Sequence, residues 1–235
     1  MCAAATGVLL FPVLLAAPSL GAVVSTFDTD AQGWTTLTAD SATAGLPVQV
    51  TAAAVFQPTG GNPGGFISFL DPDGFDSLFR APASFLGNQT SVLGGSLSFD
   101  TITDQAIDYN GPDVVIKGNG TVLVYDVAPP VGTGIWSHVS VSLAPSANWH
   151  LNSSGGPAAN LADFQSALGA VSELWVTAEY HNGTTEITGL DNVTLTAIPE
   201  PGAMLLTMSC GGIGVLSLRI PRNSTPVPRS SANQF

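Results

Sequence analysis

The amino-acid sequence predicts an all-β sandwich that contains one short helix. Glycine and proline occur every several residues through most of the chain, which is typical of short strands joined by turns. Four segments alternate apolar and polar residues, and a single segment has helical spacing. Alternation with a period of two is the pattern of an antiparallel strand with one buried face. At 235 residues, the chain has room for one medium-sized domain with appended segments.

The four alternating segments are the predicted core strands. Successive side chains of a strand point to opposite faces, so each segment is expected to bury its apolar residues and to expose the residues between them. The apolar residues that share a face are Leu97 and Phe99 in Gly94–Thr101, Val139, Val141 and Leu143 in Trp136–Leu143, Leu174, Val176, Ala178 and Tyr180 in Glu173–Tyr180, and Val193, Leu195 and Ala197 in the last strand.

The predicted helix begins after Asn160. Leu161, Phe164 and Leu168 recur at the spacing of one helix face. Asn160 can cap the first turn, because its side chain can accept hydrogen bonds from free backbone N–H groups, and Gly169 can end the helix. The sequence shows no internal repeat, so we expect a single folded domain.

The composition of residues 23–197 argues against several classes of function. This segment has sixteen Asp and Glu residues against only Arg80 and Lys117, a net charge of −14. Such a charge repels phosphate backbones, so we expect no nucleic-acid partner. The two cysteines, Cys2 and Cys210, lie in the apolar segments at the two ends, so the body offers neither a disulfide nor a thiolate metal site. The acidic charge suits either cation binding or general solubility.

The first twenty-two residues, 1–22, have the pattern of a secretion signal. Val8–Ala17 is an apolar stretch too short to span a bilayer, and small residues follow it, with cleavage expected after Ala22 or after Ala17. The stretch before it has no Lys or Arg, so the amino terminus supplies its only charge. The alternative, a buried core helix, is disfavoured because Pro12 interrupts the run.

The other end of the chain has the pattern of a single transmembrane helix. Eighteen uncharged residues, 201–218, would reach about 27 Å as a helix, enough to cross the hydrocarbon core of a bilayer. Arg219 and Arg222 follow the apolar stretch. Because positive residues favour the cytoplasmic side, these arginines place the tail inside and the body outside the cell.

The end of the chain has a Pro199-Glu200-Pro201 motif, followed by the apolar stretch and then by arginines. This order resembles the PEP-CTERM sorting signal of bacterial exported proteins. The resemblance covers residues 198–222. It implies processing by an exosortase, a membrane transpeptidase, and a place in exopolysaccharide or biofilm matrix after transient anchoring in the inner membrane. Members of that family usually stop soon after the arginines, whereas this chain adds a Pro/Ser-rich tail, 223–235. A plain membrane anchor is the alternative.

The body, 23–197, resembles a laminin B (laminin IV type A) domain over nearly all of its length. The resemblance implies a jelly-roll β-sandwich similar to carbohydrate-binding modules and discoidin-like domains, and it implies no enzyme activity. It rests on a series of short segments in the family's order, which are Ser25–Trp34, Gly65–Phe69, Ala81–Gly87, Gly95–Phe99, Trp136–Val141, Ala159–Leu168, Ala178–Tyr180 and Gly189–Leu195.

The same resemblance implies a structural calcium site at Asp28 and Asp191. In jelly rolls of this type the first and last strands are neighbours, and related carbohydrate-binding modules hold calcium near that place. The acidic residue after Phe27 and the aspartate of Leu190-Asp191-Asn192-Val193 would supply hard oxygen ligands. The alternative is that the two aspartates are exposed and cap strand ends.

Trp175 is the predicted ligand contact, with Glu173 and Glu179 accepting hydrogen bonds from sugar hydroxyls. These three residues share the strand face opposite to Leu174 and Val176. Burying two glutamates without partners is costly, so this face is expected to be exposed. Glu173 and Glu179 lie about 20 Å apart on an extended strand, too far for the carboxylate pair of a glycosidase. In the alternative, Trp175 packs under a loop or the helix.

Three classes of function therefore remain. The first is an exported surface or matrix protein whose domain binds neutral glycans or matrix components. The second is a structural surface domain without a specific ligand, and the third is a carbohydrate-active enzyme. The absence of Gly-x-Ser-x-Gly and His-Glu-x-x-His motifs from the sequence disfavours the third class.

Overall fold

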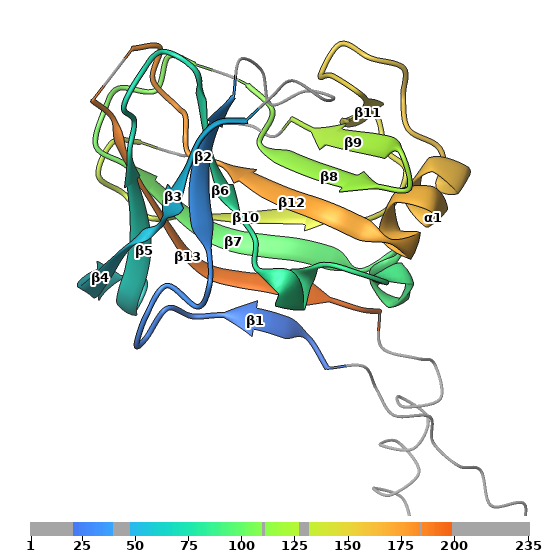
Figure 1. The fold of residues 1–235 in the computed structure, drawn as a ribbon, viewed down its shortest axis with the longest axis horizontal. Coiled ribbons are helices and arrows are strands. Elements are labelled where there is room, and N and C mark those ends of the chain that lie inside the picture. The colour runs from blue at the N-terminus through green and yellow to red at the C-terminus, as the bar shows by residue number, and fades with distance from the viewer. Residues whose placement is uncertain (1–20, 40–47, 110, 127–131, 184, 199–235) are drawn as a thin grey trace, which may run out of the picture. The chain divides into compact units, whose positions relative to one another are not determined.

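The computed structural model describes residues 21–39, 48–109, 111–126, 132–183 and 185–198 (Figure 1). They lie in a compact unit that spans Pro18–Ile198. Most of the predicted signal peptide, the Pro-Glu-Pro segment and the 223–235 tail lie outside the described residues. Within the described part of the chain, no helix is long and apolar enough to span a membrane.

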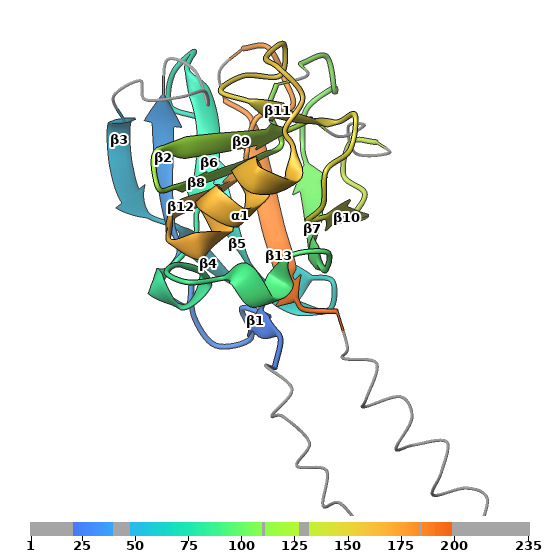
Figure 2. The same cartoon turned by 90° about the vertical axis from the view of Figure 1, so that its right-hand side faces the viewer.

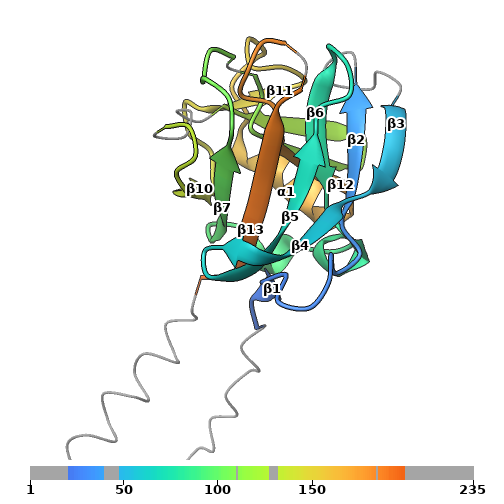
Figure 3. The same ribbon diagram turned by 90° about the vertical axis from the view of Figure 1, so that its left-hand side faces the viewer.

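Two antiparallel sheets form the fold, which confirms the predicted β-sandwich with one helix. The strand order of the first sheet is β10-β7-β13-β5-β4, and β1 pairs with β13 beside this path (Figure 3). Its strands are β1 (Val23–Ser25), β4 (Val55–Gly61), β5 (Gly64–Leu70), β7 (Ser96–Thr103), β10 (Ser137–Ser142) and β13 (Ile187–Thr196).

The second sheet has the strand order β11-β9-β8-β12-β6-β2-β3. Both sheets contain strands from the beginning, middle and end of the sequence, so the chain crosses between them repeatedly. The strands are β2 (Thr35–Ala39), β3 (Val48–Ala53), β6 (Asp76–Arg80), β8 (Val114–Gly118), β9 (Thr121–Tyr125), β11 (Trp149–Leu151) and β12 (Val171–Thr177).

Strand β10 shows how the predicted alternation becomes packing. Val139 and Val141 are buried, while His138, Ser140 and Ser142 are exposed. β10 pairs with β7 over its whole length, and the apolar residues of both strands join the core between the sheets. The first and last strands are also neighbours, with Val24 opposite Thr194, as expected.

The single α-helix, α1, spans Leu161–Gly169 and confirms the predicted helix. Asn160 accepts hydrogen bonds from the N–H groups of Ala162 and Asp163, and Asp163 accepts one from the Asn160 N–H in return. This capping box satisfies donors that the first turn would otherwise leave free. Phe164 and the residues on its face pack on β8 and β9, and α1 faces the viewer in Figure 2.

Strand β12 departs from the predicted pattern because it is buried on both faces. Leu174 and Val176 face the core between the sheets, as expected. Trp175, on the opposite face, belongs to a second buried cluster with Leu37, Ala39, Leu78 and Val115. The outer face of the second sheet is therefore covered at its centre, and the expected solvent exposure of Trp175 is wrong.

Candidate functional site

A row of polar side chains crosses the outer face of the first sheet. Asp100 on β7 lies opposite His138 on β10 and opposite Asp191 on β13. Residues paired across antiparallel strands project to the same face, so the three side chains form one line. The line continues to Asn62, in the turn between β4 and β5, and to Asn192. We call these five residues the outer polar row.

Asp100 is the centre of the row and is buried. One of its carboxylate oxygens, Oδ1, lies 2.6 Å from His138 Nδ1. The other, Oδ2, accepts hydrogen bonds from the side-chain amides of Asn62 and Asn192 at 3.2 and 2.8 Å. The carboxylate thus has three partners, which compensates for its loss of contact with water.

His138 is the exposed end of the row. Its side chain keeps 63% of its surface accessible, while the Asp100 side chain keeps 8%. A buried carboxylate that holds one ring nitrogen fixes the orientation of the ring and leaves the other nitrogen toward solvent. His138 can therefore offer a preset hydrogen-bonding group to a ligand.

Trp136 lies beside His138, just before β10 begins. Its indole N–H donates to the Gly60 carbonyl at 3.0 Å, and its ring packs edge-to-face on Phe66 with centroids 5.4 Å apart. Trp136 is half-buried, so these two contacts fix the ring without hiding it completely. Trp136 and His138, two residues apart in the sequence, are thus one aromatic and one polar side chain that are each held in place by other residues.

Asp191, a predicted calcium ligand, is completely buried in the row. Its Oδ2 accepts the Asn62 N–H and its Oδ1 accepts the Asn192 N–H, each at 2.7 Å. The pKa of Asp191 is raised, first by burial and further by the negative charges of Asp100 and Asp28. The carboxylate therefore lies within electrostatic reach of two others.

Asp28, the second predicted calcium ligand, lies in the turn after β1 rather than on the strand. It is exposed, and its Oδ2 accepts the Thr26 hydroxyl at 2.7 Å. Asp28 Oδ1 comes within 2.9 Å of the place where a side chain at Gly64 would begin, so it approaches the turn that also covers Asp191. Among the described residues, no three Asp, Glu, His or Cys side chains gather in a way that could hold a metal ion.

The predicted ligand contacts Trp175, Glu173 and Glu179 do not form an exposed surface. Trp175 has 2% of its surface accessible, its N–H donates to Glu173 Oε2 at 3.0 Å, and the Lys117 ammonium lies 3.8 Å from its ring centroid. Glu173 also forms a bidentate ion pair with Arg80. Glu173 is half-buried, with 24% of its side chain accessible, and its partners Arg80 and Trp175 offset the cost of that burial, which the alternation in the sequence does not reveal.

Glu179 lies beyond the end of β12 and is also buried. Its Oε2 accepts the Ser77 N–H at 3.3 Å. Its pKa is raised to about 8, first by burial and then by the charges of Asp71 and Glu186. Glu179 therefore belongs to a different group of acids from Glu173, at the end of the sandwich.

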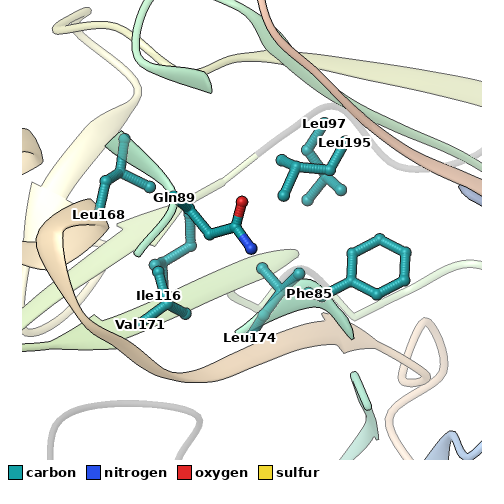
Figure 4. A pocket seen from close by; sticks show the side chains of 8 residues that line it. All are labelled: Phe85, Gln89, Leu97, Ile116, Leu168, Val171, Leu174 and Leu195. Carbon is teal, nitrogen blue, oxygen red and sulfur yellow. The ribbon is translucent and has the colours of Figure 1, made fainter. Parts of the chain in front are cut away.

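A small apolar pocket lies between the two sheets, next to α1 (Figure 4). Gln89 is its single polar lining residue. The other lining side chains belong to the core or pack on it, so this pocket offers little to a polar ligand. They are Phe85, Leu97, Ile116, Leu168, Val171, Leu174 and Leu195.

Comparison with known families and chains gives a consistent result. The family described as Laminin B (Domain IV) matches residues 78–203, more than half of the chain. Laminin subunit gamma-2 of Homo sapiens is 29% identical over 192 residues, and that of Equus caballus is 28% identical over 192 residues. Each match covers 79% of this chain but only 14% of the laminin subunit.

Among solved structures, the L4b domain of human laminin alpha-2 matches with a TM-score of 0.59 at 14% identity. The match covers 76% of this chain and 98% of that domain, and it shows a common fold. A family 11 carbohydrate-binding module from Clostridium thermocellum, in complex with a β-1,3-1,4-mixed-linked tetrasaccharide, matches with a TM-score of 0.45 at 12% identity, covering 77% of this chain and 98% of that module.

Proposed function

This chain belongs to the laminin B (domain IV) family, and we propose that it is the non-catalytic binding domain of an exported protein that works at the cell surface or in the extracellular matrix. The family match over residues 78–203 carries this proposal. The matched residues supply strands of both sheets, from most of β6 to β13, so the resemblance concerns both layers of the sandwich and not one motif. Because fold alone does not fix function, the ligand must be argued from a surface.

The ligand proposed is a neutral glycan or another matrix component, bound over Trp136 and His138. Aromatic rings offer apolar faces to sugar rings, and a neighbouring polar group can bond the hydroxyls. Trp136, just before β10, and His138, on β10, provide these two features, and their contacts with Phe66 and Asp100 fix them before binding. Preorganisation of this kind lowers the entropic cost of binding. The strongly acidic body favours a ligand without negative charge.

The surface predicted from the sequence, Trp175 with Glu173 and Glu179, remains an untested alternative for ligand binding. In the described structure it would need an opening of the cover over Trp175 before a sugar could stack there. Its Glu173 and Lys117 contacts would also have to be exchanged for ligand contacts. For these reasons the Trp136 surface is the stronger candidate.

A glycan array screened with residues 23–197, calcium present, tests the proposal. We expect binding by the unaltered domain, loss of most of it in Trp136→Ala, and retention in Ile135→Ala, an exposed neighbour that serves as control. Loss in Trp175→Ala with full binding in Trp136→Ala would move the site to the second sheet. No binding to any neutral matrix polysaccharide would leave the structural role as the function.

Sorting through Pro199-Glu200-Pro201, with Arg219 and Arg222 after the apolar stretch, is proposed as the route of export. Support for it comes from the order of these features in the sequence. Mass spectrometry of surface-exposed protein should show a first residue near Val23 and loss of the segment after about Pro201. Full-length protein in the inner membrane, unchanged when the exosortase is deleted, would exclude this route and keep a plain anchor.

A structural calcium ion at Asp28 and Asp191 is also proposed. Its support is that both carboxylates approach the Gly61–Gly64 turn and that Asp28 raises the pKa of the buried Asp191. A calcium ion would neutralise this repulsion, and each oxygen of Asp191 keeps a lone pair beside its N–H partner. The remaining ligands would be backbone carbonyls and water. Thermal denaturation with calcium and with chelator tests this site.

A further inference from the structure

Three buried carboxylates meet where the chain passes from one sheet to the other. Asp71 follows β5, Glu179 follows β12, and Glu186 precedes β13. Their exposed fractions are 3%, 6% and 1%. The backbones of the two crossovers are joined, because the Asp71 N–H donates to the Glu186 carbonyl at 2.8 Å and the Thr185 N–H donates to the Asp71 carbonyl at 3.3 Å.

Each oxygen of the Glu186 carboxylate accepts two hydrogen bonds. Its Oε1 accepts the hydroxyls of Thr103 and Thr188, and its Oε2 accepts the N–H groups of Tyr180 and His181. Four hydrogen bonds stabilise a carboxylate in its charged form. Glu186 therefore acts as a fixed negative charge beside the other two acids.

Asp71 and Glu179 are held close together by Ser77. The Ser77 hydroxyl donates to Asp71 Oδ1 at 3.0 Å, and the Ser77 N–H donates to Glu179 Oε2 at 3.3 Å. The second oxygen of Asp71, Oδ2, is buried and has no hydrogen-bond partner among the described residues. A buried, unpartnered carboxylate oxygen is costly, so this atom needs a donor.

No cation of the described residues faces this cluster. Arg80 is paired with Glu173, and Lys117 lies over Trp175. The Nδ1 atom of the His181 ring lies against Asp108 and the Ala106 carbonyl. The other titratable groups packed around the cluster are acids or phenols: Asp73, Asp76, Tyr109, Asp113 and Tyr180.

We propose that Asp71 and Glu179 share one proton at neutral pH, with the Glu179 carboxyl donating to Asp71 Oδ2. This hydrogen bond would join the β5–β6 and β12–β13 crossovers and would depend on pH, and we call it the latch. A shared proton gives the unpartnered oxygen its donor and removes one of three negative charges. Burial also raises the pKa of Asp71, as expected for a pair that retains a proton.

The sign of the pH dependence follows from the pKa of Glu179. Burial and the charges of Asp71 and Glu186 raise this pKa from the ordinary 4.5 to about 8. The folded state therefore binds one more proton than the unfolded state between these values. Stability from this proton is complete below pH 4.5 and is lost as the pH rises toward 8, with a tenfold fall in the folding equilibrium constant for each pH unit.

Chemical denaturation of the full chain between pH 5 and 9 tests the latch. In Glu179→Gln, a neutral amide that donates takes the place of the protonated carboxyl. We expect the pH dependence across this window to be weaker than in the unaltered protein by close to one proton, and the variant to fold more favourably at pH 9. Glu173→Gln, on β12 but ion-paired with Arg80, is the matched control and should keep the original slope.

A Glu179→Gln variant that is less stable at every pH, with an unchanged slope, would overturn the proposal. Should that variant fail to fold, NMR titration of the Glu179 side-chain carbon in the unaltered chain decides. A midpoint well above 4.5 supports the shared proton, and one near 4.5 refutes it. A stabilisation by calcium at pH 9 that Glu179→Gln abolishes and Asp191→Asn keeps would assign the cluster to a cation instead.

Discussion

The outer polar row and the three carboxylates Asp71, Glu179 and Glu186, which we call the crossover acids, both bury carboxylates, but the hydrogen-bond donors around them differ. In the row, Asp100 receives two amide donors and a histidine, and Asp191 receives two backbone N–H groups. At the crossovers, Asp71 and Glu179 share the donors of Ser77 and face a third carboxylate. Asp191 also faces the charges of Asp100 and Asp28, but each of its oxygens has a backbone donor, whereas one oxygen of Asp71 has none. The crossover pair is therefore the one expected to retain a proton.

The strongest test of the row concerns the Gly61–Gly64 turn, which packs closely on Asp191. An alanine at Gly61 would place its Cβ against the Gly65 carbonyl oxygen and 2.8 Å from Asp191 Oδ2. Because neither group can move without breaking the turn, we expect Gly61→Ala to lower the free energy of unfolding by about 3 kcal/mol. Denaturant titration measures this loss.

Gly74→Ala is the matched control for that change. Nothing lies within 4 Å of a Cβ at Gly74, and its loop adjoins the crossover acids. We expect a change below about 0.5 kcal/mol. Equal losses in the two variants would show that the Gly61 turn is not packed on Asp191.

The second test asks whether calcium binds at Asp28 and Asp191 and thereby stabilises the folded domain. If the ion binds Asp28 and Asp191, saturating calcium should raise the free energy of unfolding by roughly 2–4 kcal/mol through mass action. Asp191→Ala should abolish this gain, and Asp73→Ala, an acid in the β5–β6 loop, should keep it. Thermal denaturation with calcium and with chelator measures the effect, and a melting temperature that responds to neither would reject the site.

The third test removes the charge at the centre of the row. Asp100→Asn keeps the shape of the side chain but replaces one acceptor oxygen with a donor. The amides of Asn62 and Asn192 would then bond a neutral carbonyl oxygen instead of a carboxylate, and the new NH2 group would face His138, so we expect a loss of about 2 kcal/mol. Ser98→Ala, two residues away on the same strand face, should change stability by less than about 0.5 kcal/mol. An Asp100→Asn variant as stable as the control would mean that the row is solvated.

These two regions also show which features the sequence could predict. The helix with its Asn160 cap and the alternating valines of β10 follow from local patterns and were confirmed, whereas the predicted exposed face of β12 was wrong. The position of His138 on the outer face followed from the same alternation. Its pairing with Asp100 did not, because register between distant strands leaves no local signal.

Trp175 shows where the local pattern misleads. Alternation says that Trp175 lies opposite to Leu174, but it does not say whether the second face is covered. Exposure of this face was expected because burying glutamates without partners is costly, but Arg80, from another strand, forms an ion pair with Glu173. Asp71 and Glu179 were likewise joined only by folding, since the crossovers that bring them together lie far apart in the sequence.

The last and smallest expected effect concerns the exposed end of the row. His138 has 63% of its side chain accessible and makes one hydrogen bond, to Asp100. Exposed ion pairs contribute little, because water screens them and holding the side chain costs entropy. Asp100 would keep its two amide donors without the histidine, so we expect His138→Ala to cost less than about 1 kcal/mol. Thermal denaturation measures this, and glycan binding by the same variant shows whether the ring serves a ligand. A loss as large as that of Asp100→Asn would mean that the histidine contributes as much to the stability of the row as the Asp100 carboxylate does.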